Sequence, residues 1–176
     1  METPPTGDLV LDEVERPSCV YLRCDKDRCQ GRQIGLVSVS AGLKVVQLVI
    51  SDACRGLVES VADFLPEPHH QAFAGVLNGG IVGTLLDCHS NWTAAYTLMK
   101  ARGLDHPPAT VTAEFSVKLR APTPLNERLR LVARSIAVEG DKVTVDARLE
   151  ASAATTATCR GVFIAVKEGH PAYFRW

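Results

Sequence analysis

The pattern of apolar and polar residues predicts two strands in the first third of the chain. Residues 34–40 and 43–50 are short runs rich in Val, Ile and Leu, and an Ala-Gly pair between them is typical of a hairpin turn. Residues 57–64 follow with mixed spacing and are interpreted as a short helix. Two prolines just beyond them begin a predicted loop that continues to residue 77.

One long helix is predicted over residues 79–102, because apolar side chains recur around much of its circumference. A helix with this pattern is buried on most sides rather than lying on a surface. Asn78 is a favourable N-cap residue, and Gly103 is a favourable residue just beyond the C-terminus. The sequence therefore predicts a central helix with defined ends.

The strand predicted over residues 110–119 shows a clear alternation. Val111, Phe115 and Leu119 belong to the apolar set, and an uninterrupted strand would place them on one face. Thr112 would then lie on the opposite, polar face.

Three further strands are predicted over residues 129–138, 143–151 and 156–166, with Glu-Gly-Asp-Lys forming the turn between the first two. Apart from the short helix at residues 57–64, the predicted order is therefore two strands, one long helix and four strands, without an internal repeat. This order fits an α+β fold in which one curved antiparallel sheet wraps around one long central helix.

Composition narrows the class of protein. The chain has 176 residues, of which 46% are hydrophobic and 22% are charged, which suits a single globular domain. A net charge of −1 argues against nucleic acid or an anionic membrane as a partner. No uncharged apolar run reaches the length of about 18 residues that suggests a membrane span. The acidic N-terminus does not resemble a signal peptide, so we expect a cytoplasmic protein.

The cysteines are expected to be free thiols rather than metal ligands. Three of the six follow a C-x4-C-x4-C pattern, which differs from the C-x2-C spacing of zinc knuckles: Cys19, Cys24 and Cys29. The other three lie in apolar segments, where cysteine most simply acts as a small buried hydrophobe: Cys54, Cys88 and Cys159. We expect neither a metal nor another cofactor.

The segment G-V-L-N-G-G-I-V-G-T-L-L-D contains the residues best suited to chemistry. Gly79 and Gly80 open the long helix, where backbone N–H groups lack helical partners and the helix dipole is positive. Asp87 lies two turns further on among apolar residues. An oxyanion donor and a carboxylate are the minimal groups for hydrolysing an acyl bond. A capped helix start and a structural aspartate are the alternative interpretation.

This segment resembles the hotdog-fold thioesterases of the PaaI (phenylacetate-pathway) type. Their pattern is roughly G-x-x-H-G-G, then six residues, then Asp or Glu, and the strand pattern extends the resemblance to about residues 34–166. This chain has Asn78 where most members have His. The resemblance implies that Asn78 is a catalytic-site residue that helps to hold the loop and the carbonyl region, although asparagine cannot act as an acid or base near neutral pH. Capping of the helix alone is the alternative. The resemblance implies a hotdog fold and hydrolysis of acyl-CoA thioesters. Gly79 would donate its N–H to the thioester oxygen, and Asp87 would act as a general base or as a nucleophile.

The spacing also bears on assembly. Asp87 lies about 13 Å beyond the helix start, because an α-helix rises about 1.5 Å per residue. The resemblance implies a homodimer, or a homotetramer built as a dimer of dimers. Two helices would then lie side by side, with Asp87 of one protomer facing Gly79 of the other.

Other residues are weaker candidates for substrate binding. The resemblance implies that Gln71 orients the attacking water and that Thr112 positions the substrate or the carboxylate. Lys118 and Arg120 would suit the phosphates of coenzyme A. For each of these residues, an ordinary surface position is an alternative. Gly80 is expected to allow close packing.

We expect an N-terminal arm with a Cys-containing lead-in at residues 1–33, a thioesterase domain at residues 34–167 and a tail at residues 168–176. Two other functions remain open. The first is an acyl-CoA binding or sensing domain without catalysis, and the second is a hotdog hydratase or dehydratase.

Overall fold

The computed structural model describes residues 19–20, 34–40, 43–53 and 57–173, with side chains described from residue 58 onward. The expectations for the N-terminal arm and for Cys24, Cys29 and Cys54 lie outside these residues.

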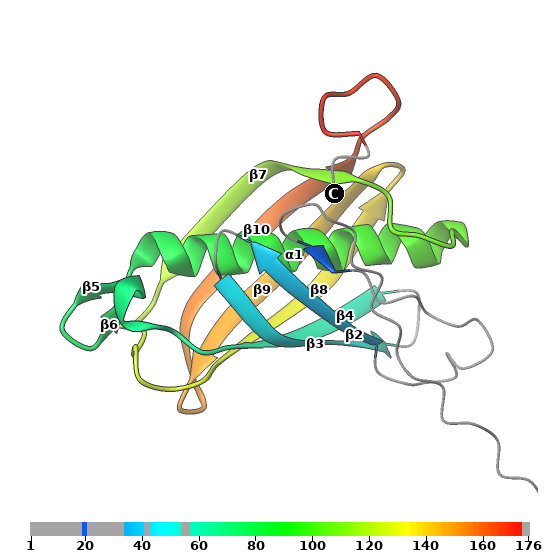
Figure 1. Cartoon of the computed structure of the whole chain (residues 1–176). Helices are drawn as coiled ribbons and strands as arrows, with labels where there is room; N and C mark the ends of the chain where they lie inside the picture. The colour runs from blue at the N-terminus through cyan, green and yellow to red at the C-terminus, as the bar shows by residue number, and fades with distance from the viewer. Residues whose placement is uncertain (1–18, 21–33, 41–42, 54–56, 174–176) are drawn as a thin grey trace, which may run out of the picture.

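The chain folds as an antiparallel sheet that curves around one long helix (Figure 1). The strand order is β1-β2-β3-β4-β8-β9-β10-β7, and a separate hairpin, β5-β6, precedes the helix. The elements are β1 (Cys19–Val20), β2 (Ile34–Ser40), β3 (Leu43–Ala53), β4 (Leu57–Phe64), a 3-10 turn (Pro68–His70), β5 (Gln71–Phe73), β6 (Val76–Leu77), α1 (Gly79–Arg102), β7 (Thr110–Leu119), β8 (Leu129–Glu139), β9 (Lys142–Ala151) and β10 (Ala154–Ala165). The predicted fold class, the β2–β3 hairpin and the β8–β9 hairpin are confirmed.

The helix begins and ends where the sequence predicts. The Gly80 N–H donates to Asn78 Oδ1 at 2.7 Å, which makes Asn78 an N-cap. Gly103 has φ 62°, a left-handed conformation that glycine adopts at low cost, and its N–H donates to the Lys100 carbonyl. Leu86 and Leu98 are fully buried, so α1 forms the centre of the core.

The prediction of a helix at residues 57–64 is wrong, because this segment is the strand β4. β4 lies between β3 and β8, and its alternate residues Val58, Ser60, Ala62 and Phe64 are buried. Ser60 interrupts the apolar pattern in the sequence. Pairing with a strand on each side decides the conformation, since it satisfies backbone groups that the buried segment could not leave unpaired. The predicted loop before α1 likewise contains the β5–β6 hairpin.

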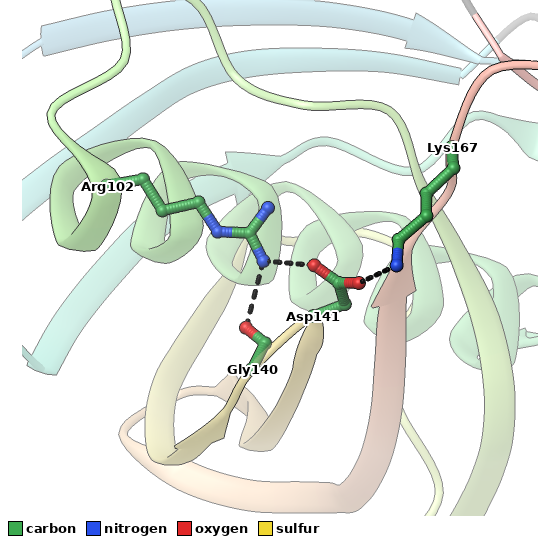
Figure 2. A network of polar contacts seen from close by, with 4 residues as sticks. All are labelled: Arg102, Gly140, Asp141 and Lys167. Atoms are coloured by element: carbon green, nitrogen blue, oxygen red, sulfur yellow. Dashed lines mark hydrogen bonds and ion pairs between the residues drawn. The ribbon is translucent and has the colours of Figure 1, made fainter.

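The C-terminal end of α1 is held by a polar network (Figure 2). Arg102 Nη2 donates to the Gly140 carbonyl at 2.9 Å and to Asp141 Oδ1 at 2.6 Å. Lys167 Nζ lies 3.2 Å from Asp141 Oδ2. Hydrogen bonds from Lys167 and then Arg102 lower the pKa of the Asp141 carboxyl. The network therefore ties the last turn of the helix to the β8–β9 turn and to the segment after β10.

A buried polar cluster joins α1 to β4. The Thr93 hydroxyl donates to the His89 carbonyl at 2.8 Å, so it accepts from the Ser60 hydroxyl, 2.5 Å away. His89 Nε2 then donates toward Ser60, with the carbonyl at 3.2 Å and the hydroxyl at 3.1 Å. Burial lowers the pKa of His89 from 6.5 to about 4. The imidazole is therefore neutral in the folded protein at neutral pH.

We predict that the free energy of unfolding decreases as the pH falls from 6.5 toward 4. An unfolded histidine binds its proton near pH 6.5, whereas folded His89 does so only near pH 4, so acid favours the unfolded chain. The difference between the folded and unfolded pKa values of His89 accounts for a decrease of up to about 3 kcal/mol in the free energy of unfolding. His89→Gln keeps an N–H donor without titrating and should lack this component in urea unfolding measured across this pH range.

The matched control is His106→Gln, which replaces an exposed histidine. That variant should keep the parent's pH dependence. An equally steep pH dependence in His89→Gln would show that other groups account for the loss.

Candidate active site

One face of α1 lies along the edge strand β7, with the two elements running in opposite directions. The residues on this face recur at every fourth position: Gly79, Gly83, Asp87 and Asn91. A Cβ on Gly79 would lie 3.2 Å from Leu119 Cδ1, and a Cβ on Gly83 would lie 4.0 Å from Phe115 Cε1. The contact at Gly79 is tight, so the absence of a side chain there lets the start of the helix approach β7 closely, whereas a Cβ at Gly83 would make an ordinary contact.

Further along the same face, α1 and β7 make polar contacts. The Thr112 hydroxyl donates to Asp87 Oδ1 at 2.9 Å. One turn later the Thr110 hydroxyl donates to Asn91 Oδ1, and Asn91 Nδ2 donates to the Thr110 carbonyl at 3.4 Å. Asp87 is half-buried, and Thr112 is exposed. The structure therefore places a carboxylate that is both oriented and accessible between helix and strand.

An irregularity in β7 turns Thr112 toward the helix. Glu114 pairs with Val162 of β10, but the next pair joins Thr112 with Phe163 and omits Ala113. This β-bulge reverses the alternation of side chains beyond it. The predicted placement of Thr112 on the face opposite Phe115 and Leu119 is therefore wrong.

The start of the helix presents an available donor. Asn78 Oδ1 is occupied by the Gly80 N–H, and the Asn78 carbonyl accepts from Val82 N at 3.0 Å. Within the described part of the chain, the N–H of Gly79 has no acceptor, and this residue is exposed. A Cβ on Gly80 would lie 3.0 Å from Asn78 Oδ1, so Gly80 serves the cap itself.

The donor and the carboxylate do not meet within one protomer. Asp87 lies eight positions after Gly79 in the helix, a rise of about 12 Å. Both lie beside β7, which ends the described sheet and leaves Phe115 37% exposed and Leu119 61% exposed. One chain thus presents the two groups separately along an open edge.

Some predicted site residues lie elsewhere. Gln71 Oε1 accepts from Gly75 N at 3.2 Å, which braces the β5–β6 hairpin. Lys118 and Arg120 line a hollow on the outer face of the sheet, which is the face turned away from α1. The structure does not bring these three side chains to Asp87.

Two residues that lie near Asp87, Cys159 and Asn91, were not predicted from the sequence to do so. Burial, followed by the negative charge of Asp87, raises the pKa of Cys159 to about 12, so the thiol beneath the carboxylate is neutral. Asn91 anchors β7 one turn beyond Asp87. The spacing of Asn91 from Asp87 was a usable signal, whereas the proximity of Cys159 depends on strand register.

Among the described residues, no group of three or more His, Cys, Asp or Glu side chains is placed so that it could hold a metal ion. Within the same residues, no helix has the length and apolar character to cross a membrane.

Comparison with known proteins identifies the class of protein. No protein-family model matches the sequence, and no curated protein matches it. Among solved structures, a thioesterase superfamily protein from Shewanella loihica is 30% identical over 62% of this chain and 84% of that chain, with a TM-score of 0.53. Zebrafish thioesterase superfamily member 2 is 20% identical over 68% and 81% of the two chains, with a TM-score of 0.54. Escherichia coli PaaI, from the phenylacetic acid degradation operon, is 14% identical over 68% and 80%, with a TM-score of 0.55.

The last two similarities concern the fold alone, and they confirm the hotdog fold. With the identity to the Shewanella protein, the fold identifies the family: this chain belongs to the thioesterase superfamily.

We predict that Asn78 stabilises the protein through its cap. Asn78→Leu removes the acceptor of the Gly80 N–H and should lower the free energy of unfolding by about 0.5–2 kcal/mol in urea titration. Asn78→Ser retains an acceptor oxygen and should stay close to the parent. Equal stability of the Leu and Ser variants would contradict this role.

Proposed function

We propose that this protein hydrolyses acyl-CoA thioesters at sites shared by two protomers. The observation that carries the proposal is the accessible Asp87 carboxylate, oriented by Thr112 on the helix face that also presents Gly79. Membership of the thioesterase superfamily supports the same reaction class.

A second copy of the chain resolves the separation of the two groups. Two α1 helices packed in opposite directions through their Gly79–Asp87 faces would bring each carboxylate to the other copy's helix start. The open edge of β7, with exposed Phe115 and Leu119, supplies apolar surface for such an association. We propose a homodimer as the catalytic unit, alone or paired into a tetramer.

The chemistry needs only water besides the thioester. The carbonyl oxygen would accept from the Gly79 N–H, and Asp87 would remove a proton as the water oxygen bonds to the carbonyl carbon. The N–H stabilises the resulting oxyanion. The carbon–sulfur bond then breaks, and the CoA thiolate leaves and is protonated. In a second route Asp87 itself attacks the carbonyl, and water hydrolyses the resulting anhydride.

The direct test of the carboxylate is Asp87→Asn. The Thr112 hydroxyl can still donate to the new Oδ1, so the variant removes the charge with little change in shape. We expect kcat for a CoA thioester to fall by about three orders of magnitude or more, while folding and assembly persist. A kcat near that of the parent would exclude Asp87 as the reacting group.

The role of the Gly79 N–H can be isolated with two substitutions. Gly79→Pro removes the N–H at the first helical position, where proline is favoured, and the preceding Asn78 has a compatible ψ of 132°. Gly79→Ala adds a similar Cβ but keeps the donor. We expect Gly79→Pro to lose far more kcat than Gly79→Ala.

Mixing tests whether the site is shared. Heterodimers of Asp87→Asn and Gly79→Pro protomers contain one intact site, so random exchange should restore about a quarter of the parent activity. Absence of recovery after subunit exchange is confirmed by mass spectrometry would show that each site is built within one chain.

A further inference from the structure

A cationic cluster surrounds Thr158 on the outer face of the sheet. Lys118 of β7 and Arg148 of β9 pair directly with Thr158 of β10, one from each side. Arg120 Nε–H donates to the Thr158 hydroxyl oxygen at 3.4 Å, which leaves the hydroxyl hydrogen for another acceptor. We define the Thr158 cluster as these four residues. Neighbouring strands are about 4.8 Å apart, so Lys118 and Arg148 begin about 10 Å from each other.

The positive charge of this cluster is incompletely compensated. Arg148 Nε lies 2.6 Å from Glu150 Oε1, and its terminal nitrogens make no ion pair within the described residues. Lys118 and Arg120 have no carboxylate at ion-pair distance in the same part of the chain. Like charges gathered on one face of a sheet repel each other, so an anion bound between them would be stabilised.

The neighbouring rows of the outer face are different. In the row on one side, Asp146 pairs across the strands with both Arg134 and Arg160, and it accepts two 2.6 Å hydrogen bonds from Arg160. In the row on the other side, Arg130 lies between Asp63 and Glu150. Each of these rows interleaves acids with bases, whereas the row through Thr158 places a cation on each side of a neutral hydroxyl, without an acid between them.

The Thr158 cluster lies in a hollow of about 870 Å³, which is within the size range of small-ligand sites. Ser116 also lines the hollow and adds a second hydroxyl. The complete lining holds five cationic side chains and three carboxylates, Glu59, Glu114 and Asp146, so positive charge is in excess. We propose that this hollow binds a phosphate-bearing anion of the pyrophosphate type, such as the diphosphate of a nucleotide. Lys118, Arg120 and Arg148 would supply charge-assisted hydrogen bonds, and Thr158 would supply a neutral one.

This site lies on the opposite face of the sheet from Asp87, so its existence does not depend on the proposed hydrolysis. Two sources can supply its ligand, because coenzyme A carries a diphosphate and so do free nucleotides. The chemistry recognised is the same for both.

The test is equilibrium binding by calorimetry to the full chain, with inorganic pyrophosphate, ADP and CoA as separate probes. Lys118→Gln and Arg148→Gln should each weaken pyrophosphate binding by about tenfold. The matched control is Arg130→Gln, which removes the same charge from the same face, and it should change the affinity by less than about twofold. Absence of saturable binding, or an equal loss in the control variant, would overturn the site.

The two sources are then separated by kinetics and binding. If the substrate's own CoA occupies the hollow, Lys118→Gln should raise KM for a CoA thioester and leave KM unchanged for the matching N-acetylcysteamine thioester, which has no phosphate. If a free nucleotide occupies it, Lys118→Gln should weaken ADP binding and leave both KM values unchanged. Either result supports the site, and the binding measurements retain their meaning even if the protein hydrolyses neither thioester.

Discussion

The arrangement of the candidate site depends on the close approach of α1 to the edge strand β7. Gly79 leaves room for Leu119, and Gly83 lies beside Phe115, so the first turns of the helix pack closely against the strand. The same approach brings Asp87 within hydrogen-bonding distance of Thr112. A larger side chain at the first glycine would press on Leu119, and part of this geometry would have to shift.

The edge of the sheet beside the candidate site is exposed to solvent. The first two residues of α1, Gly79 and Gly80, and most of β7 are exposed, including two large apolar side chains of β7. Such an edge invites association with another chain. In the proposed dimer the two exposed edges would pack against each other, because Gly79 of one copy would face Asp87 of the other. Stability and chemistry would then depend on the same contact between protomers.

The two faces of the sheet differ in burial and in charge. The inner face packs against α1, and Ser60 on this face hydrogen-bonds with His89 and Thr93 of the helix. The outer face is charged, and most of its bases alternate with acids across the strands. The row through Thr158 departs from this alternation. Because the sheet separates the two faces, a ligand on the outer face would act on the proposed site only through strands β7 and β10 or as part of the same substrate.

Local sequence determined the central helix and the positions of the candidate site residues on it. The N-cap, the glycine pair, the spacing to Asp87 and the terminal Gly103 are all local features, because each acts through backbone conformation or helical periodicity. The two long hairpins were also predictable, since alternation and turn residues encode them within a few positions. These features were sufficient to indicate the fold class and the family resemblance.

Tertiary structure decided the features that depend on pairing between distant segments. β4 became a strand because β3 and β8 satisfy its backbone on both sides, and buried Ser60 found partners on α1. The bulge at Ala113 exists only in the register between β7 and β10, yet it turns Thr112 toward Asp87. The same register places Lys118 beside Thr158, on the face away from the carboxylate. The alternation of residues along β7 cannot reveal that Ala113 is left unpaired, because the pairing depends on the neighbouring strand β10.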